Sequence, residues 1–196
     1  MDSKEDQNSI GACPVSEAKI AAMKAKVQAW LEPGQPGHAI LPSPQLPSSS
    51  ATKEEEEKGS PLRICLLDGF LLYAAPTTVL GSSVAPLLDV RLFLRVSRER
   101  ATARRSARDG YATLEGFWKD PPGYVDRIVW PNYVASHAWL FERGDVESGA
   151  LDPRVLADHG IHALPPSAEV DVDMETTFEW AVDTLMRELE SRAGLR

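Results

Sequence analysis

A short apolar run that ends at an acidic residue constrains the fold of this chain more than any other feature. Residues 63–67 read Arg-Ile-Cys-Leu-Leu, and Asp68 and Gly69 follow directly. Such a run is typical of a buried parallel strand with a carboxylate at its C-terminal end. Cys65 lies inside the run and is therefore expected to be a small buried hydrophobic residue. The sequence thus predicts a parallel sheet that includes this run.

A second apolar run, residues 90–96, predicts another strand of the same sheet. One face of this strand is expected to carry Val90, Leu92, Leu94 and Val96. Residues 77–88 lie between the two runs and are long enough for a crossover helix or a helical turn. Strand, crossover and strand make a βαβ unit, so the chain is expected to have an α/β fold.

The N-terminal part of the chain divides into segments of different character. Residues 1–32 are expected to contain an irregular stretch and then a helix that is capped by Ser16 and ends at Leu31. Residues 33–60 are rich in Pro, Ser and Gly and include a run of four glutamates, so they are expected to form a disordered surface insertion. Residues 61–196 are expected to hold the rest of the α/β domain.

Helix caps and apolar spacing predict the later elements. Ser97 is expected to cap an arginine-rich helix, and a loop containing Gly and Pro is expected at 109–124. The next helix is predicted at about 125–141. Residues 161–164 are a candidate last strand, and residues 174–189 carry apolar side chains at helical spacing.

The overall composition excludes several kinds of partner. The 196 residues carry a net charge of −8, whereas general nucleic-acid binding calls for a net basic surface. No apolar run approaches the roughly 20 residues that a membrane span needs. The first eight residues are polar and acidic, unlike a secretory signal. We therefore expect no nucleic-acid or membrane partner and a location in the cytoplasm or nucleus; the oligomeric state does not follow from the sequence.

Asp68 is a candidate ligand for a metal ion. Ligands of open α/β sheets bind beyond the carboxyl ends of the strands, and a carboxylate there can hold Mg²⁺ directly or through water. The alternative is a solvated aspartate in the turn before Gly69. The residues alone leave both interpretations open.

A cluster of three arginines is the strongest chemical signal in the sequence. On a helix, Arg104 and Arg108 share a face, whereas Arg105 points roughly 100° away. Guanidinium groups stay charged and offer forked donors that match phosphate oxygens, so one face could hold a nucleotide and the other a second ligand. The alternative is a solvated basic helix whose arginines pair with nearby acids.

The loop that follows the arginines has the features of a mobile lid. Gly110 and Tyr111 come directly after the cluster, and residues 121–124 read Pro-Pro-Gly-Tyr. A lid of this kind, at about 98–125, would close over bound ligands and exclude water.

Aromatic side chains accompany this lid. Trp118 and Tyr124 offer faces that could stack on a base or on a positively charged pyridinium ring. The alternative is that these rings simply pack the lid. For Trp130 we expect packing.

Taken in order, several strings resemble the nicotinamide riboside kinase family, particularly its fungal members. Residues 67–73, Leu-Asp-Gly-Phe-Leu-Leu-Tyr, are similar to a segment at a strand end in that family. Residues 104–108, Arg-Arg-Ser-Ala-Arg, are similar to the family's lid helix. Residues 122–126 and 129–133 are similar to the stretch that closes the lid. The match extends over about 63–142.

This resemblance implies a P-loop nucleoside-kinase fold, with a parallel sheet and flanking helices. It implies transfer of the γ-phosphate of ATP, with Mg²⁺, to the 5′-hydroxyl of nicotinamide riboside. The small-molecule partners would then be a nucleoside and ATP. The positions it implies for the site are Arg104 and Arg108 for ATP and transition-state charge, Arg105, Gly110 and Tyr111 for the nucleoside, Ser167 near the adenine, and Asp68 for Mg²⁺.

One part of the family pattern is missing. The phosphate-binding motif Gly-x-x-x-x-Gly-Lys-Ser/Thr, whose backbone N–H groups and Lys hold the phosphates, does not occur in the sequence. The family's first strand also lies before the matched region. We therefore expect a truncated kinase that is inactive as it stands. The alternatives are a uridine- or pantothenate-type kinase with the same fold and a non-catalytic pseudokinase that binds nucleotide.

Overall fold

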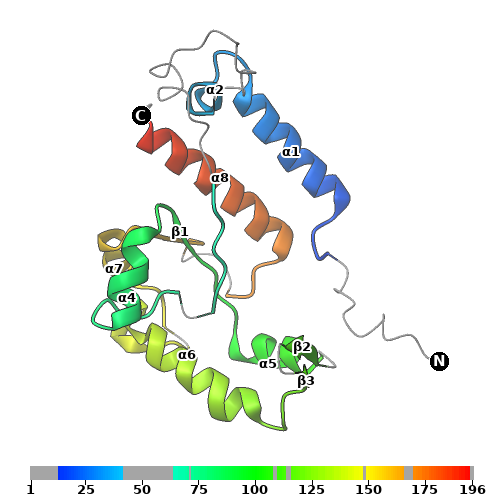
Figure 1. Cartoon of the computed structure of the whole chain (residues 1–196), viewed down its shortest axis with the longest axis vertical. Helices are drawn as coiled ribbons and strands as arrows, with labels where there is room; N and C mark the ends of the chain where they lie inside the picture. Colours follow the sequence, from blue (N-terminus) through cyan, green and yellow to red (C-terminus); the bar gives the residue numbers. More distant parts are fainter. Residues whose placement is uncertain are drawn as a thin grey trace, which may run out of the picture. The chain divides into compact units, whose positions relative to one another are not determined.

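The chain forms two compact units, which are described separately below (Figure 1). The α/β unit contains Gly69–Asp173, and the helical unit contains Pro14–Asp68 together with Met174–Arg196. The structure is a computed structural model. It describes residues 13–41, 64–70, 72–107, 110–113, 116–147, 149–165 and 170–194.

The helical unit is built from α1 (Glu17–Leu31), the short α2 (Pro36–Ile40) and α8 (Met174–Arg192). The predicted start of α1 is confirmed, because the Ser16 hydroxyl accepts a hydrogen bond from the backbone N–H of Lys19 at 3.2 Å. The helix ends at Leu31, as expected. α2 falls inside the segment that was expected to be disordered.

Side chains of α1 reach α8 at three successive points. Lys19 Nζ lies 2.5 Å from a carboxylate oxygen of Glu179, and Lys26 Nζ lies 2.5 Å from Asp183. Trp30 Nε1–H donates to Glu190 at 2.8 Å. Because each pair involves a residue near position 20 to 30 and one about 160 further along the chain, these contacts hold the two ends of the described chain in a single unit.

The α/β unit contains short strands and many short helices. In chain order these are α4 (Val79–Val84), η2 (Ala85–Leu87), β1 (Arg91–Phe93), α5 (Arg98–Ser106), β2 (Tyr111–Thr113), β3 (Gly116–Trp118), η3 (Val125–Val129), α6 (Trp130–His137), η4 (Ala138–Leu140), η5 (Glu142–Gly144), α7 (Pro153–Asp158) and β4 (Ile161–Ala163). β1 pairs with β4 in parallel, and Phe93 lies opposite Ala163. The helix after Ser97, the helix after the lid and the last strand are confirmed. A helix, α4, also forms within 77–88, but it does not connect two strands of the described sheet.

The first predicted strand is wrong. Within the described residues 64–69 the chain has no strand, and Ile64, Cys65 and Leu66 are exposed, Leu66 by 86%. An apolar run becomes a strand only where a neighbouring strand satisfies its backbone N–H and C=O groups. No described residue pairs with this run. Cys65 is accordingly exposed rather than buried.

The second predicted strand is shorter than expected, and its buried face is the opposite one. Phe93 is only 5% exposed, whereas Leu94 is 54% exposed. The reason lies in the aromatic side chains that pack beside β1. Phe93 meets Tyr73 and Phe141 edge to face, at centroid distances of 5.7 and 6.4 Å.

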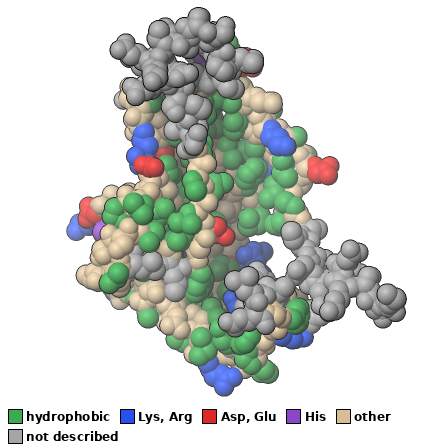
Figure 2. Space-filling model, in the orientation of Figure 1, with side chains coloured by type: hydrophobic (Ala, Val, Ile, Leu, Met, Phe, Trp, Pro, Cys, Tyr) green, Lys and Arg blue, Asp and Glu red, His purple; other side chains and the backbone are tan. Residues whose placement is uncertain are grey.

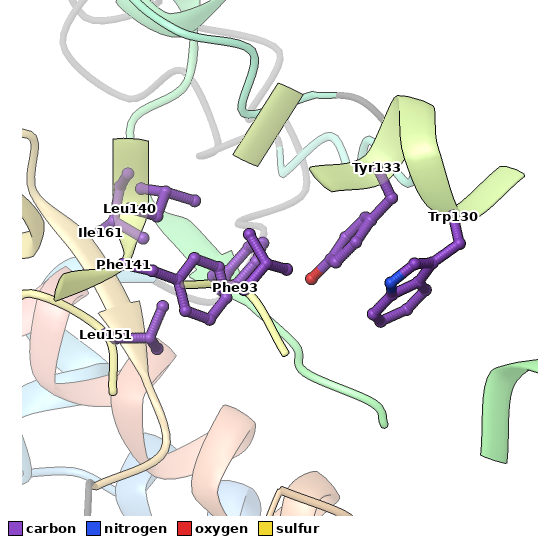
Figure 3. Close-up of a cluster of buried hydrophobic side chains, with 8 residues drawn as sticks. Phe93, Trp130, Tyr133, Leu140, Phe141, Leu151 and Ile161 are labelled. Atoms are coloured by element: carbon purple, nitrogen blue, oxygen red, sulfur yellow. The ribbon is translucent and has the colours of Figure 1, made fainter. Parts of the chain in front are cut away.

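The core of the α/β unit gathers around these rings (Figure 3). Its buried members are Phe93, Trp130, Tyr133, Leu140, Phe141, Val146, Leu151 and Ile161. α6 supplies two of them from one side, and the chain just after it supplies Leu140 and Phe141. His137 is buried among the same rings and donates from Nδ1 to the backbone oxygen of Tyr133 at 2.9 Å.

Hydrophobic side chains also lie on the surface (Figure 2). The large exposed ones include Ile64, Leu66, Leu67, Val79 and Leu87. Isolated apolar residues on a surface are ordinary in soluble proteins. Three of these residues, however, belong to the run whose strand is missing.

Candidate functional site

The arginine-bearing helix α5 begins where the sequence predicted. The Ser97 hydroxyl accepts the backbone N–H of Arg100 at 3.1 Å, which satisfies one of the free N–H groups at the helix start. Glu99 lies in the first turn, and Arg104 and Arg105 lie in the last turn. Both placements are favourable with the helix dipole, whose N-terminal end is positive.

Arg104 and Arg105 line the same cavity, which has a volume of about 190 Å³. Val96 and Ala101 belong to the same side of the cavity, near the start of α5. The opposite wall comes from the chain after the lid. Its members are Val125, Val129, Trp130 and Tyr133, and Phe70 completes the lining. The cavity is therefore mostly apolar with two guanidinium groups, a common composition for a small-molecule site.

Arg105 is held by a carboxylate from the lid. Its Nε lies 2.5 Å from Oδ2 of Asp120, and its Nη2 donates to Oδ1 of the same residue at 3.3 Å. The side chains are 29% and 17% exposed, so this ion pair is more shielded than a surface pair. Arg104, by contrast, is exposed. Pairing with an acid, the alternative considered from the sequence, thus occurs at Arg105, which nevertheless lines the cavity.

Two aromatic residues complete the surroundings of Arg105. Its guanidinium carbon lies 5.7 Å from the ring centroid of Tyr124, within the range of a cation–π contact. Trp118 donates from Nε1 to Asp120 at 2.9 Å, and its ring meets that of Tyr124 at 6.3 Å. The lid therefore holds Arg105 by charge, by hydrogen bonds and by an aromatic face.

The lid itself contains a hairpin that the sequence did not predict. β2 and β3 pair in antiparallel fashion inside the stretch that was expected to be a loop. Gly110 precedes the hairpin with φ +114°, and a Cβ at that position would collide with the ring of Phe117 and the backbone oxygen of Trp118. The position therefore requires glycine. Tyr111 lies in β2, and only its backbone is described.

Trp130 packs in the core, as expected. It is 6% exposed, and its Nε1–H donates to Glu147 at 2.7 Å. Glu147 also receives a hydrogen bond from Arg98 Nη1 at 3.2 Å. Trp130 thus lines the cavity, and its bond to Glu147 connects it to Arg98 at the start of α5.

Of the sequence-predicted site residues, Arg104 and Arg105 belong to the described lining of this cavity, whereas Gly110, Tyr111, Arg108, Ser167 and Asp68 do not. Arg108 and Ser167 lie outside the described residues. Asp68 is exposed and belongs to the helical unit. Over the described part of the chain, no group of three or more His, Cys, Asp or Glu side chains could hold a metal ion.

Sequence reasoning missed two acidic residues that contact the lid. Asp120 was passed over, although an acid before two prolines on a lid with three arginines is a signal that could have been used. Asp171 contacts Ser97, which lies 74 residues earlier in the chain, and no local sequence pattern predicts a contact over that separation. Burial alone would raise the pKa of the Asp171 carboxyl, but hydrogen bonds from Ser97 and the charges of Arg100 and Arg104 hold it below its usual range.

The described unit is an α/β protein, in which the parallel strand β1 leads into the arginine-bearing helix α5. The guanidinium groups that line the cavity suit an anionic ligand. The sequence is 35% identical over 127 residues to the nicotinamide riboside kinase of Schizosaccharomyces pombe, which covers 65% of this chain and 49% of that protein. It is 42% identical over 92 residues to the nicotinamide riboside kinase of Eremothecium gossypii, covering 47% of this chain and 36% of that protein. These likenesses confirm that the matched part of the chain resembles the nicotinamide riboside kinases.

The family extends beyond fungi. The chain is 36% identical over 117 residues to nicotinamide riboside kinase 2 of Homo sapiens, covering 58% of this chain and 40% of that protein. The chain spans about half the length, or less, of the curated relatives that it matches. No family model matches it, and no solved structure matches it. None of the described helices is both long enough and apolar enough to cross a membrane.

Proposed function

We propose that this chain binds ATP and nicotinamide riboside and forms the lid side of a kinase that makes nicotinamide mononucleotide for NAD salvage. The observation that carries the proposal is the cavity lined by both Arg104 and Arg105. These two residues lie in the part of the chain that is related to the nicotinamide riboside kinases. The relatives also imply a P-loop kinase fold, and a location in the cytoplasm is part of the same proposal.

The proposed reaction is a phosphoryl transfer. The 5′-hydroxyl oxygen of the nucleoside forms a bond to the γ-phosphorus of ATP, the bond from that phosphorus to the β–γ bridging oxygen breaks, and ADP leaves. The hydroxyl proton passes to a general base, a role that none of the residues assigned here takes. Negative charge spreads over the transferring group, so fixed guanidinium groups stabilise the transition state.

The arginines divide between the two ligands. We assign Arg104 to the phosphates of ATP, because it is exposed and lines the cavity. The family resemblance adds Arg108, for ATP, and Ser167, near the adenine, to this half of the proposal; both lie outside the described residues. Arg105 is assigned to the nucleoside, together with Gly110 and Tyr111 at the start of the lid hairpin.

The aromatic residues beside Arg105 suit a nicotinamide ring. The nicotinamide of the riboside is a pyridinium and carries a positive charge, which aromatic faces attract by up to about 2 kcal/mol when water is excluded. Tyr124 and Trp118 offer such faces, and the carboxylate of Asp120 adds a negative charge near them.

Mg²⁺ would be held largely by the phosphates of ATP. This ion commonly takes only one or two protein carboxylates and keeps several waters. The proposal gives it the carboxylate of Asp68, which is exposed to solvent. When bound together with ATP, the ion would supply charge neutralisation. Of this chain's own residues, only Asp68 is assigned to hold it.

Substitution of the two arginines tests the division of roles. We expect Arg105→Ala to raise the dissociation constant for nicotinamide riboside by about 10-fold with a smaller effect on ATP, and Arg104→Ala to do the reverse, because lost charge-assisted hydrogen bonds cost about 1.5–3 kcal/mol. Calorimetric titration of the full 196-residue chain measures both constants. Arg154→Ala, on the exposed surface of α7, is the matched control. Equal effects of the two substitutions on both ligands would contradict the assignment.

A second candidate is a nucleotide-binding protein without kinase activity. It requires only that the cavity lined by Arg104 and Arg105 hold a nucleotide. Incubation of the chain with ATP, Mg²⁺ and nicotinamide riboside, followed by chromatography for nicotinamide mononucleotide, separates the two candidates. Uridine and pantothenate as competing acceptors test the specificity. Failure to bind either ATP or nicotinamide riboside would overturn both candidates.

A further inference from the structure

The lid helix is anchored at its start by a carboxylate from a distant part of the α/β unit. The backbone N–H of Ser97 donates to Oδ1 of Asp171 at 2.9 Å, and the Ser97 hydroxyl donates to Oδ2 at 2.6 Å. Both oxygens of one carboxylate are thus engaged by one residue, 74 positions away in the sequence. Hydrogen bonds to a charged acceptor are among the stronger ones in proteins.

The same serine belongs to the helix cap. While its hydroxyl hydrogen points to Asp171, its oxygen accepts the backbone N–H of Arg100 at 3.1 Å. A hydroxyl has one donor and two acceptor sites, so both bonds can form together. Arg100 Nη1 also reaches the backbone oxygen of Asp171, at 3.4 Å. Ser97 and Arg100 therefore both connect the start of α5 to Asp171, in the segment after β4.

Asp171 also lies close enough to Arg104 for their charges to interact. Two effects of the carboxylate on a bound phosphate would then oppose each other. Its negative charge, taken alone, would repel a phosphate from Arg104. Its bonds to Ser97, however, restrict how α5 tilts, and the tilt determines where Arg104 and Arg105 point. Removal of the carboxylate distinguishes the two effects. Affinity for a phosphate rises if repulsion is the larger effect, and it falls if the placement of α5 is the larger one.

We propose that Asp171 is a positioning residue of the lid, which acts through Ser97 to direct Arg104 and Arg105 into the cavity. The identity of the ligands rests on the proposed function, whereas the anchoring of α5 does not. Neither oxygen of Asp171 needs to touch a ligand for this role. Substitutions at positions 97 and 171 are therefore expected to change ligand affinity from a distance.

The experiment compares Asp171→Ala, Asp171→Asn, Ser97→Ala and the conservative Ser97→Thr in the full chain, with inorganic tripolyphosphate as the probe. We expect the dissociation constant for tripolyphosphate to rise about 5- to 10-fold in the first three variants and to stay within about 2-fold in Ser97→Thr, which keeps the hydroxyl. Asp126→Asn is the matched control. Asp126 also pairs with the first turn of α5, because its Oδ1 lies 2.9 Å from Nη2 of Arg98, but this contact involves Arg98 and not Ser97. It should stay within about 2-fold of the original chain.

A second measurement does not depend on any ligand. The Nε–H of Arg105 is bonded to Asp120, more than one helical turn from Ser97, and its hydrogen exchange can be followed by nuclear magnetic resonance. Asp171→Ala should speed this exchange at least about 5-fold, and Asp126→Asn should leave it unchanged. If tripolyphosphate does not bind to the original chain, the proposed function fails and the exchange rate still decides the role of Asp171.

Two results would overturn the inference. One is tripolyphosphate affinity that is unchanged or higher in both Asp171 variants, which would mean that the carboxylate only repels anions. The other is an Arg105 exchange rate that is the same in Asp171→Ala and in the original chain. If Asp171→Ala fails to give a cooperative thermal transition, Ser97→Ala provides the same two readouts with a smaller change.

Discussion

Arg105 illustrates how single residues of the lid depend on one another. Its guanidinium is bonded to Asp120 and lies over Tyr124, and Trp118 in turn donates to Asp120. A long side chain of this kind loses about 2 kcal/mol of rotamer freedom when it is held in one place. Because these contacts already hold the side chain, they would lower the entropy cost of binding the proposed nucleoside.

The indole N–H of Trp118 tests this idea at the residue scale. Trp118→Phe keeps an aromatic ring beside Tyr124 but removes the hydrogen bond to Asp120. We expect the dissociation constant for nicotinamide riboside to rise about 3- to 5-fold, because Asp120 is then less firmly placed against Arg105, while the constant for ATP changes less than 2-fold. Titration calorimetry measures both. The same substitution at Trp180, in α8 of the other unit, should change neither; a Trp118 variant with an unaltered nicotinamide riboside constant would contradict the argument.

His137 should make the stability of the chain depend on pH. Burial lowers the pKa of this imidazole below its ordinary value near 6.5, although the hydrogen bond to the Tyr133 backbone acts in the opposite direction. The unfolded chain therefore binds a proton more readily than the folded chain does. The contribution of neutral, buried His137 to the free energy of unfolding is fully present above about pH 6.5. It is lost as the pH falls through the lower pKa of the folded state.

The prediction is a free energy of unfolding that decreases from about pH 7 to pH 5, with a smaller decrease in His137→Phe. Urea unfolding at several pH values measures it. His159→Gln leaves the buried imidazole in place and should retain the full dependence. An unchanged pH dependence in His137→Phe would show that other groups cause it.

At the scale of secondary-structure elements, α1 and α2 approach each other closely at Trp30 and Gly37. Gly37 of α2 is buried, and a Cβ there would overlap the indole ring and the backbone oxygen of Trp30. The turn between the helices is formed with Gly34 at φ +86°, a conformation that glycine adopts without strain. α2 therefore forms inside a segment of disorder-prone composition because a large aromatic side chain gives it a surface to pack on.

Gly37→Ala should destabilise this contact by about 1–3 kcal/mol, the usual cost of overpacking a filled site. Urea unfolding followed by circular dichroism measures the loss. In a Trp30→Ala background the additional cost of Gly37→Ala should be smaller, because the ring that the methyl group meets is gone. The same cost in both backgrounds would mean that Trp30 is not the obstacle.

Among the elements, those defined by local signals were predictable. Ser16 and Ser97 cap helices by bonds that span three residues, so the pattern is present in the sequence itself. The strand expected at 63–67 was not predictable in the same way. Its apolar residues fit a buried strand, but the hydrogen-bonded neighbour that would make it one is not specified by its own sequence.

The candidate site was predictable to a similar degree. The arginine cluster was recognised from residue types, and Arg104 and Arg105 do line one cavity. The role of residues 98–125 as a lid stays a prediction. The partners Asp120 and Asp171 were not recognised, because one lies across the unpredicted hairpin and the other lies 74 residues from its contact. The roles of the site residues stay predictions until ligands are bound.

At the scale of the whole molecule, the chain alternates between its two units. α1 and α8, at opposite ends of the described chain, belong to one unit, and the lid and core between them belong to the other. The helical unit thus combines two segments that are far apart in the chain and share no sequence pattern. It is held together by contacts such as Lys19 with Glu179 and Trp30 with Glu190.

The sequence by itself determined the helix starts, the arginine cluster and the resemblance to the nicotinamide riboside kinases, because each depends on neighbouring residues or on strings of matching residues. Only the tertiary structure decided that Phe93 rather than Leu94 is buried, that α2 packs against Trp30, and that Asp120 and Asp171 hold the lid. The physical reason is that burial and charge pairing depend on which surfaces meet, and residues far apart in the chain meet only after it has folded.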